Sequence, residues 1–180
     1  MVFALNKFTN INNIAECSIV LMNGKTKFSK LIRFFSPRYK NDTFTHAGIY
    51  FGGPKNLLCH QVGYGTALQP AKEEFDACYD VSIWTNKTIP NSTLNKIKTF
   101  CLTTSKPYDF KEIKSMAVPW IKRSNGLICT ELVLQIFKNS GFPIMGNTTA
   151  KVSPSKLQEI LEKDVNWKLA YKISDGIENI

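Results

Sequence analysis

The stretch Thr45-His-Ala-Gly-Ile-Tyr-Phe-Gly-Gly53 is followed by Pro54, and a second apolar segment runs from Asn56 to Val62. Two strand-length segments joined by a short glycine turn are typical of a β-hairpin. The chain has only two histidines: His46 lies early in the first predicted strand and His60 in the middle of the second. Antiparallel pairing across the turn would place them side by side, with Cβ atoms roughly 4.5–5.5 Å apart.

Outward from this hairpin, the spacing of apolar residues predicts further strands and helices on both sides. The predicted strands cover residues 18–22, 80–85 and 167–173, and the predicted helices cover residues 27–35, 91–102, 127–139 and 155–163, with one more between Asp109 and Pro119. Strands dominate the first half of the chain and helices the second. This order predicts an α+β fold in which an antiparallel sheet packs against helices.

Length and composition favour one folding unit. With 180 residues, of which 43% are hydrophobic, the chain can bury a core, so we expect a single domain over residues 1–180. It has no run of about 18 or more uncharged apolar residues, so a membrane-spanning helix is not expected. Residues 1–8 have neither the basic start nor the apolar block of a secretory signal, which favours a cytoplasmic location.

The cysteines and the net charge bear on cofactors and partners. Five cysteines form an odd set without a CxxC pair. This pattern fits neither a disulfide framework nor a zinc site, so we expect reduced, mostly buried thiols and no metal or other cofactor. The net charge of +9 favours anionic partners such as anionic lipid or acidic wall polymer, without an obligate nucleic acid.

Cys129 is the candidate nucleophile. It lies near the start of the helix predicted over residues 127–139, where unpaired N–H groups and the helix dipole lower the pKa of a thiol. A thiolate beside an imidazole that a third polar group orients is the arrangement required for acyl transfer through a thioester. The backbone N–H of Cys129 would also face a developing oxyanion. The plainer interpretation is that this cysteine only packs in the core.

Four parts of the sequence together carry a resemblance to a known family. They are Thr45 to Gly53, then His60, then Pro107-Tyr-Asp-Phe110, and then Ile128-Cys-Thr-Glu-Leu-Val133. In this order they resemble the circularly permuted papain-like enzymes related to NlpC hydrolases, particularly the YaeF/YiiX group. In ordinary NlpC enzymes the cysteine helix precedes the histidine strand, whereas in the permuted group the histidine strand comes first, as here. The resemblance covers roughly residues 15–140 and implies a papain-like fold.

The resemblance also implies a role for each candidate residue. Cys129 matches the nucleophile, His46 its base, and His60 the polar residue that orients the base. The third position is open, because Gln61 would face the site instead if the strand register differed by one residue.

Two more residues near the predicted nucleophile have open roles. Tyr108 matches a tyrosine upstream of the nucleophile in related enzymes, where it would shape the substrate site or pack in the core. Glu131 is expected to stabilise the N-terminus of the cysteine helix, although orientation of the base is the alternative.

Three functions fit these residues. The first is a thiol amidase or peptidase that acts on a small peptide or a wall-derived amide. The second is a lipid-directed thiol acyltransferase or phospholipase, because lecithin:retinol acyltransferase-like enzymes share the order His, His, Cys; their Asn-Cys-Glu-His motif is here Ile128-Cys-Thr-Glu131. The third is a non-enzymatic binding or virus-associated protein, since permuted relatives also occur in viruses. The sequence predicts neither the bond that is cleaved nor the oligomeric state.

Overall fold

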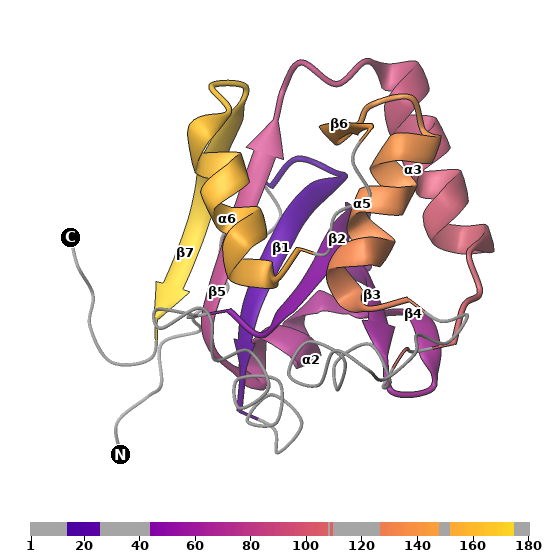
Figure 1. The fold of residues 1–180 in the computed structure, drawn as a ribbon. Coiled ribbons are helices and arrows are strands. Elements are labelled where there is room, and N and C mark those ends of the chain that lie inside the picture. The colour runs from indigo at the N-terminus through magenta and orange to yellow at the C-terminus, as the bar shows by residue number, and fades with distance from the viewer. Residues whose placement is uncertain (1–13, 26–43, 108, 110–126, 148–151, 175–180) are drawn as a thin grey trace, which may run out of the picture.

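The computed structural model describes residues 14–25, 44–107, 109, 127–147 and 152–174 (Figure 1). Its helices and strands follow the chain in this order: β1 (Ser18–Gly24), β2 (His46–Gly52), β3 (Leu57–Val62), β4 (Gly65–Pro70), α2 (Ala71–Asp76), β5 (Cys78–Asn86), α3 (Asn91–Thr103), α5 (Cys129–Asn139), β6 (Ile144–Asn147), α6 (Pro154–Lys163) and β7 (Trp167–Ser174).

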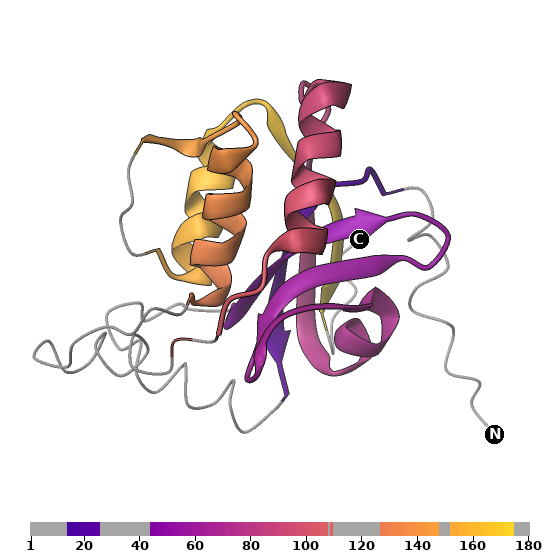
Figure 2. The same cartoon turned by 90° about the vertical axis from the view of Figure 1, so that its right-hand side faces the viewer.

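Strands β1 to β5 and β7 form one antiparallel sheet in the order β4-β3-β2-β1-β5-β7. Helices α3, α5 and α6 lie on one face of this sheet, and α2 lies on the other (Figures 1 and 2). The predicted hairpin is formed by β2 and β3, and Gly52 and Gly53 at its turn have φ values of 77° and 72°. Glycine adopts such positive φ values without steric cost. The predicted α+β architecture, an antiparallel sheet packed against helices, is confirmed.

The core has two layers because successive side chains of a strand point to opposite faces of the sheet. In β1, Ile19 and Leu21 pack towards α3, α5 and α6, whereas Val20 and Met22 pack with Phe75 of α2. All four β1 side chains are buried, and burial of each stabilises the fold by about 1.5–3 kcal/mol. Burial on both faces explains why this strand is a continuous apolar run.

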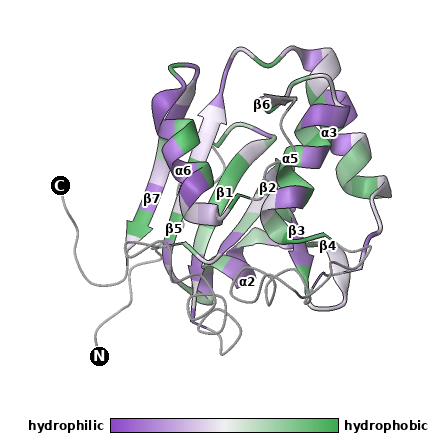
Figure 3. Cartoon of the chain, viewed as in Figure 1, coloured by the Kyte–Doolittle hydropathy of each residue, from purple (hydrophilic) through white to green (hydrophobic). Residues whose placement is uncertain are grey.

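Helix α5 carries the candidate nucleophile at its first position. Its buried residues recur at helical spacing and are Cys129, Thr130, Leu132, Val133, Ile136 and Phe137. This apolar stripe packs against β2 and β3, and Figure 3 shows hydrophobic and hydrophilic residues on different sides of the helix. The helix ends at Asn139, and Gly141 follows with a φ of 84°. A glycine with positive φ directly after the last turn is a common end of a helix, and the end at Asn139 agrees with the predicted helix over residues 127–139.

Three short elements were not predicted: β4, α2 and β6. Each has only four to six residues, which is too few for a hydrophobic period to show clearly. The predicted helix over residues 27–35 and the one between Asp109 and Pro119 lie outside the described residues. Among the helices that the structure describes, none has the length and apolarity needed to cross a membrane.

Candidate active site

A hydrogen bond joins the two histidines. Nε2 of His46 lies 2.9 Å from Nδ1 of His60, and the two rings meet edge to face with centroids 5.2 Å apart. The residue directly opposite His60 is Gly48, so the histidines are diagonal rather than direct cross-strand neighbours. His46 is the first residue of β2, at the end of the sheet, and His60 is only 1% exposed. The predicted proximity of the two rings is confirmed, with this change of register.

Gly48 leaves the space in which this pair forms. A Cβ atom at Gly48 would lie 3.0 Å from the carbonyl oxygen of Cys59 and 3.0 Å from Cβ of His60. We expect Gly48→Ala to lower the unfolding free energy by about 1–3 kcal/mol and to weaken the bond between His60 and His46. Urea unfolding and ring ¹⁵N NMR measure the two effects.

The control is Gly53→Ala. At Gly53 φ is 72° and a Cβ atom would meet open space. This variant should lose about 1–2 kcal/mol of unfolding free energy through backbone strain, while its histidine ring signals should stay unchanged. Unchanged ring signals in Gly48→Ala would contradict the prediction.

Backbone amides act on the thiol of Cys129 near the predicted base. The N–H groups of Ala47, Thr130 and Cys129 itself favour the thiolate form of this side chain and so act to lower its pKa. Ala47 directly follows His46 in β2, and the Cα atoms of consecutive residues are about 3.8 Å apart. The start of α5 therefore brings the thiol to the strand end that carries His46.

Two hydrogen bonds fix the first turn of α5. The carboxylate of Glu131 accepts a hydrogen bond from the backbone N–H of Ile128 at 3.2 Å, and the hydroxyl of Thr130 donates to the carbonyl of Val152 at 2.5 Å. The Glu131 bond satisfies an amide that the helix leaves unpaired. The expected structural role of Glu131 at the helix N-terminus is confirmed.

Burial keeps the thiol of Cys129 neutral. The side chain is 4% exposed, and loss of hydration raises its pKa from an ordinary value of 9.0 to about 11, although the three N–H groups act in the opposite direction. The nearby carboxylate of Glu131 raises the pKa a little further. The prediction that the helix start lowers this pKa is therefore wrong for the resting protein, because desolvation outweighs the helix-terminal amides.

The two imidazoles are neutral as well. Burial, and then the neighbouring His60, lower the pKa of His46 from 6.5 to about 3. Burial also lowers the pKa of His60, against the opposing effects of the Glu74 carboxylate and of the hydrogen bond to Gln69. Near neutral pH the candidate site therefore holds an uncharged thiol and two uncharged imidazoles.

The lowered pKa of His46 predicts acid sensitivity of the fold. Between about pH 6.5 and pH 3, His46 binds a proton in the unfolded chain but not in the folded one. The unfolding free energy is therefore unaffected above that window and falls as the pH falls through it, by up to about 1.4 kcal/mol per pH unit. Urea unfolding at about pH 7, 6 and 5, above the main titration of carboxylates, measures this slope. The slope should be shallower in His46→Asn, and an equal slope in both proteins would contradict the assignment.

Gln61 does not orient the base. Its side chain is fully buried, and its Nε2 donates to the carbonyl of Lys106 at 2.8 Å while its Oε1 accepts from the hydroxyl of Thr66 at 2.8 Å. Because side chains alternate along β3, Gln61 points to the face opposite His60. Of the candidates for the third position, His60 is the residue that contacts His46. Tyr108 lies outside the described residues.

The sequence reasoning missed Gln69. Its Oε1 lies 2.8 Å from Nε2 of His60, so both ring nitrogens of His60 are hydrogen bonded. Gln69 comes from β4, which was not predicted. The sequence Gly65-Thr-Ala-Leu-Gln-Pro70 has no alternation of polar and apolar residues, so it offered no clear strand signal.

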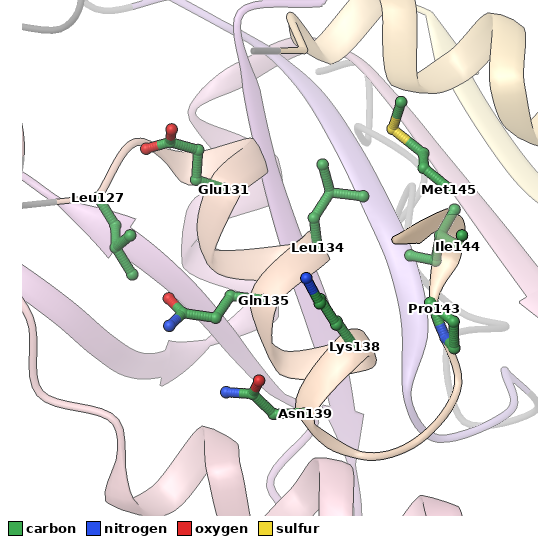
Figure 4. A pocket seen from close by; sticks show the side chains of 10 residues that line it. Leu127, Glu131, Leu134, Gln135, Lys138, Asn139, Pro143, Ile144 and Met145 are labelled. Atoms are coloured by element: carbon green, nitrogen blue, oxygen red, sulfur yellow. The ribbon is translucent and has the colours of Figure 1, made fainter. Parts of the chain in front are cut away.

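A hollow of about 310 Å³ lies on the outer side of α5. Figure 4 shows Glu131, Leu134 and Lys138 of α5 directed towards it, beside the segment that contains Ile144. Cys129 is not among its lining residues, and a position two residues along a helix is rotated by about 200° around the axis. The hollow therefore belongs to the face of α5 turned away from the thiol, and it is not part of the candidate site.

The fold and the site define the class of protein: an α+β, papain-like domain with a buried cysteine at a helix start beside a histidine pair. The chain is similar to a solved structure, that of the metalloprotein YiiX from Escherichia coli O157:H7 (DUF1105), with a TM-score of 0.54 and 16% sequence identity. The similarity covers 88% of this chain and 87% of that one. It establishes the fold, and it supports the expected likeness to the YiiX group. No family model and no curated protein matches the sequence.

The similar structure is that of a metalloprotein, but the described residues of this chain do not match a metal site. In the part of the chain that the structure describes, no three His, Cys, Asp or Glu side chains form a group that would hold a metal ion. Nε2 of His46 and both ring nitrogens of His60 are already engaged in hydrogen bonds. All five cysteines are buried, and none of them forms a disulfide. The described residues thus do not fit a metal site.

Proposed function

We propose that this protein is a cysteine-dependent hydrolase of the amidase or peptidase class, which acts through a thioester on Cys129. The observation that carries the proposal is that the backbone N–H of Ala47, the residue after His46, acts on the thiol of Cys129 and favours its thiolate form. His46 in turn is bonded to His60 at 2.9 Å. We infer from these neighbours that Cys129, His46 and His60 act as nucleophile, base and orienting group, as in thiol hydrolases with a catalytic triad.

In the proposed acylation step, Nδ1 of His46 takes the thiol proton while the sulfur of Cys129 bonds to the substrate carbonyl carbon. The carbonyl π electrons move to the oxygen and form an oxyanion. When that oxyanion collapses, the carbon–nitrogen bond breaks, and the amine leaves with the proton returned by His46. The product of this step is a thioester on Cys129 and a free amine.

In the proposed deacylation step, water attacks the thioester and gives a proton to His46. The carbon–sulfur bond then breaks, the acid leaves, and the proton returns to the sulfur of Cys129. In this proposal His60 holds the imidazolium in place during both steps, because its Nδ1 lies 2.9 Å from Nε2 of His46 and accepts the hydrogen bond that the imidazolium donates.

The amides around the sulfur support anionic chemistry at this position. The N–H groups of Ala47, Thr130 and Cys129 act to lower the pKa of the thiol, because they stabilise a developing thiolate more than a neutral thiol. The amide of Cys129 is also the group proposed to donate to the oxyanion. The neutral resting pair therefore becomes charged only as the substrate reacts.

The proposed substrate is a small peptide or another amide, and a panel of acyl donors tests this. Purified protein would be incubated with 4-nitrophenyl acetate, 4-nitrophenyl octanoate and a set of dipeptide 4-nitroanilides, and its intact mass followed. Acylation of Cys129 together with turnover of an anilide supports the amidase proposal. Turnover of the octanoyl ester alone would favour the lipid-directed alternative. The absence of any adduct on Cys129 across the panel would overturn the hydrolase proposal.

A further inference from the structure

We propose that Gln69 is a positioning residue that selects the tautomers of His60 and His46 and so makes Nδ1 of His46 the basic nitrogen of the site. This inference rests on the proposed function, because it assigns a fourth member to the same set of residues. Gln69 touches neither the thiol nor the site of the proposed reaction; it acts through His60.

The three side chains form a line across three neighbouring strands. His46 lies in β2, His60 in β3 and Gln69 in β4, all on one face of the sheet, and Gln69 is paired with Leu58 and is thus diagonal to His60. The distances are 2.9 Å from His46 to His60 and 2.8 Å from His60 to Gln69. Because His60 is 1% exposed, water does not readily replace Gln69 as the partner of its outer nitrogen.

The direction of these hydrogen bonds follows from the chemistry of the groups. The carbonyl oxygen Oε1 of Gln69 only accepts, so Nε2 of His60 must carry its proton. A neutral imidazole has a single N–H, which leaves Nδ1 of His60 bare. That nitrogen accepts from Nε2–H of His46, and Nδ1 of His46 is therefore the nitrogen without a proton.

The opposite direction would disable the base. If Gln69 presented its amide N–H₂ group, Nε2 of His60 would accept, its Nδ1 would donate, and Nε2 of His46 would become an acceptor. His46 would then carry a proton on Nδ1 and could not take one from the thiol of Cys129 there. The orientation of one amide thus decides whether the base is in its competent form.

Glu74 is the charged group that faces His60 from α2. Its carboxylate favours a positive charge on His60, but both ring nitrogens of His60 are already bonded to His46 and Gln69. Glu74 therefore acts on His60 through its field, while the tautomer is selected by the hydrogen bond to Gln69.

Ring ¹⁵N NMR of histidine-labelled protein tests this inference directly, since the chain has only two histidines. In the native protein both rings should carry their proton on Nε2. Gln69→Leu should move a measurable share of His46 to the Nδ1–H form, and Gln69→Glu, which keeps an acceptor oxygen, should retain the Nε2–H form. A native protein with Nδ1–H on His46, or ring signals that do not respond to Gln69→Leu, would overturn the inference.

The matched control is Gln61→Leu. Gln61 is a buried glutamine on the neighbouring strand whose amide bonds to Lys106 and Thr66 on the other face of the sheet. This variant should lose stability but keep the native ring tautomers. Equal changes in the two leucine variants would show a general packing effect and would count against a specific role of Gln69.

Steady-state kinetics of the Gln69 variants test whether the tautomer of His46 affects turnover. Loss of a partner that orients a metal-bound histidine typically costs about tenfold to a hundredfold. We expect a loss of similar size here, so kcat/KM should fall by that factor in Gln69→Leu and recover in Gln69→Glu. A fall without a change of tautomer would overturn the inference. Ring signals that respond to Gln69 in a protein without any turnover would count against the proposed hydrolase and leave the tautomer assignment intact.

Discussion

The Cys129→Ala variant is expected to lose turnover by roughly 10⁴-fold or more, because no other group at the start of α5 would form the thioester. Its fold should persist, since Cys129 is one small side chain in a large apolar cluster. Initial rates on the substrate found in the acyl-donor panel measure the loss, and intact mass should show that the adduct is absent.

Cys101→Ala is the matched control for this variant. Cys101 lies in α3, is a free thiol in the same apolar cluster and is 4% exposed, the same fraction as Cys129. The two substitutions remove the same atoms from similar surroundings, so their effects on thermal unfolding should be similar. Activity should survive only in Cys101→Ala. Full activity in Cys129→Ala would exclude Cys129 as the nucleophile.

The His46→Asn variant is expected to lower kcat by about 10²–10⁴-fold, the usual contribution of a general base. Asparagine has no nitrogen that takes up a proton near neutral pH, so the buried thiol, with a pKa of about 11, would remain protonated. Measurement of kcat on the panel substrate, with thermal unfolding as a check on the fold, gives the size of the effect.

The same substitution at His60 separates the base from the residue that orients it. In His60→Asn the side-chain oxygen can occupy nearly the position of Nδ1 and can still accept from Nε2–H of His46. We therefore expect a clearly smaller loss of kcat than in His46→Asn. Equal losses in the two variants would contradict the assignment of His46 as the base that acts directly on the thiol.

Most of the fold could be predicted because its signals are local. The strand-length apolar segments of β2 and β3, the paired glycines between them, and the apolar stripe of α5 each lie within a few consecutive residues. The missed elements have only four to six residues. A pattern so short carries too little information to separate a strand from a loop.

The sequence identified the residues of the candidate site, but it did not predict their protonation states. Cys129, His46 and His60 were singled out by residue type and chain order, and the structure brings them to one end of the sheet. The expected acidity of the thiol was wrong, because burial at 4% exposure outweighs three favourable amides. Gln69 was missed because its role depends on the pairing of β3 with β4.

By itself the sequence determined the hairpin and the helix that carries Cys129, since apolar periodicity and turn residues depend on neighbouring residues only. It also determined the order of the two histidines before the cysteine, which is read directly from the chain. The tertiary structure decided the diagonal register that joins His46 to His60, the contact of the thiol with the amide of Ala47, and the neutral state of all three groups. The physical reason is that strand register and desolvation arise from segments far apart in the chain, which only the folded protein brings together.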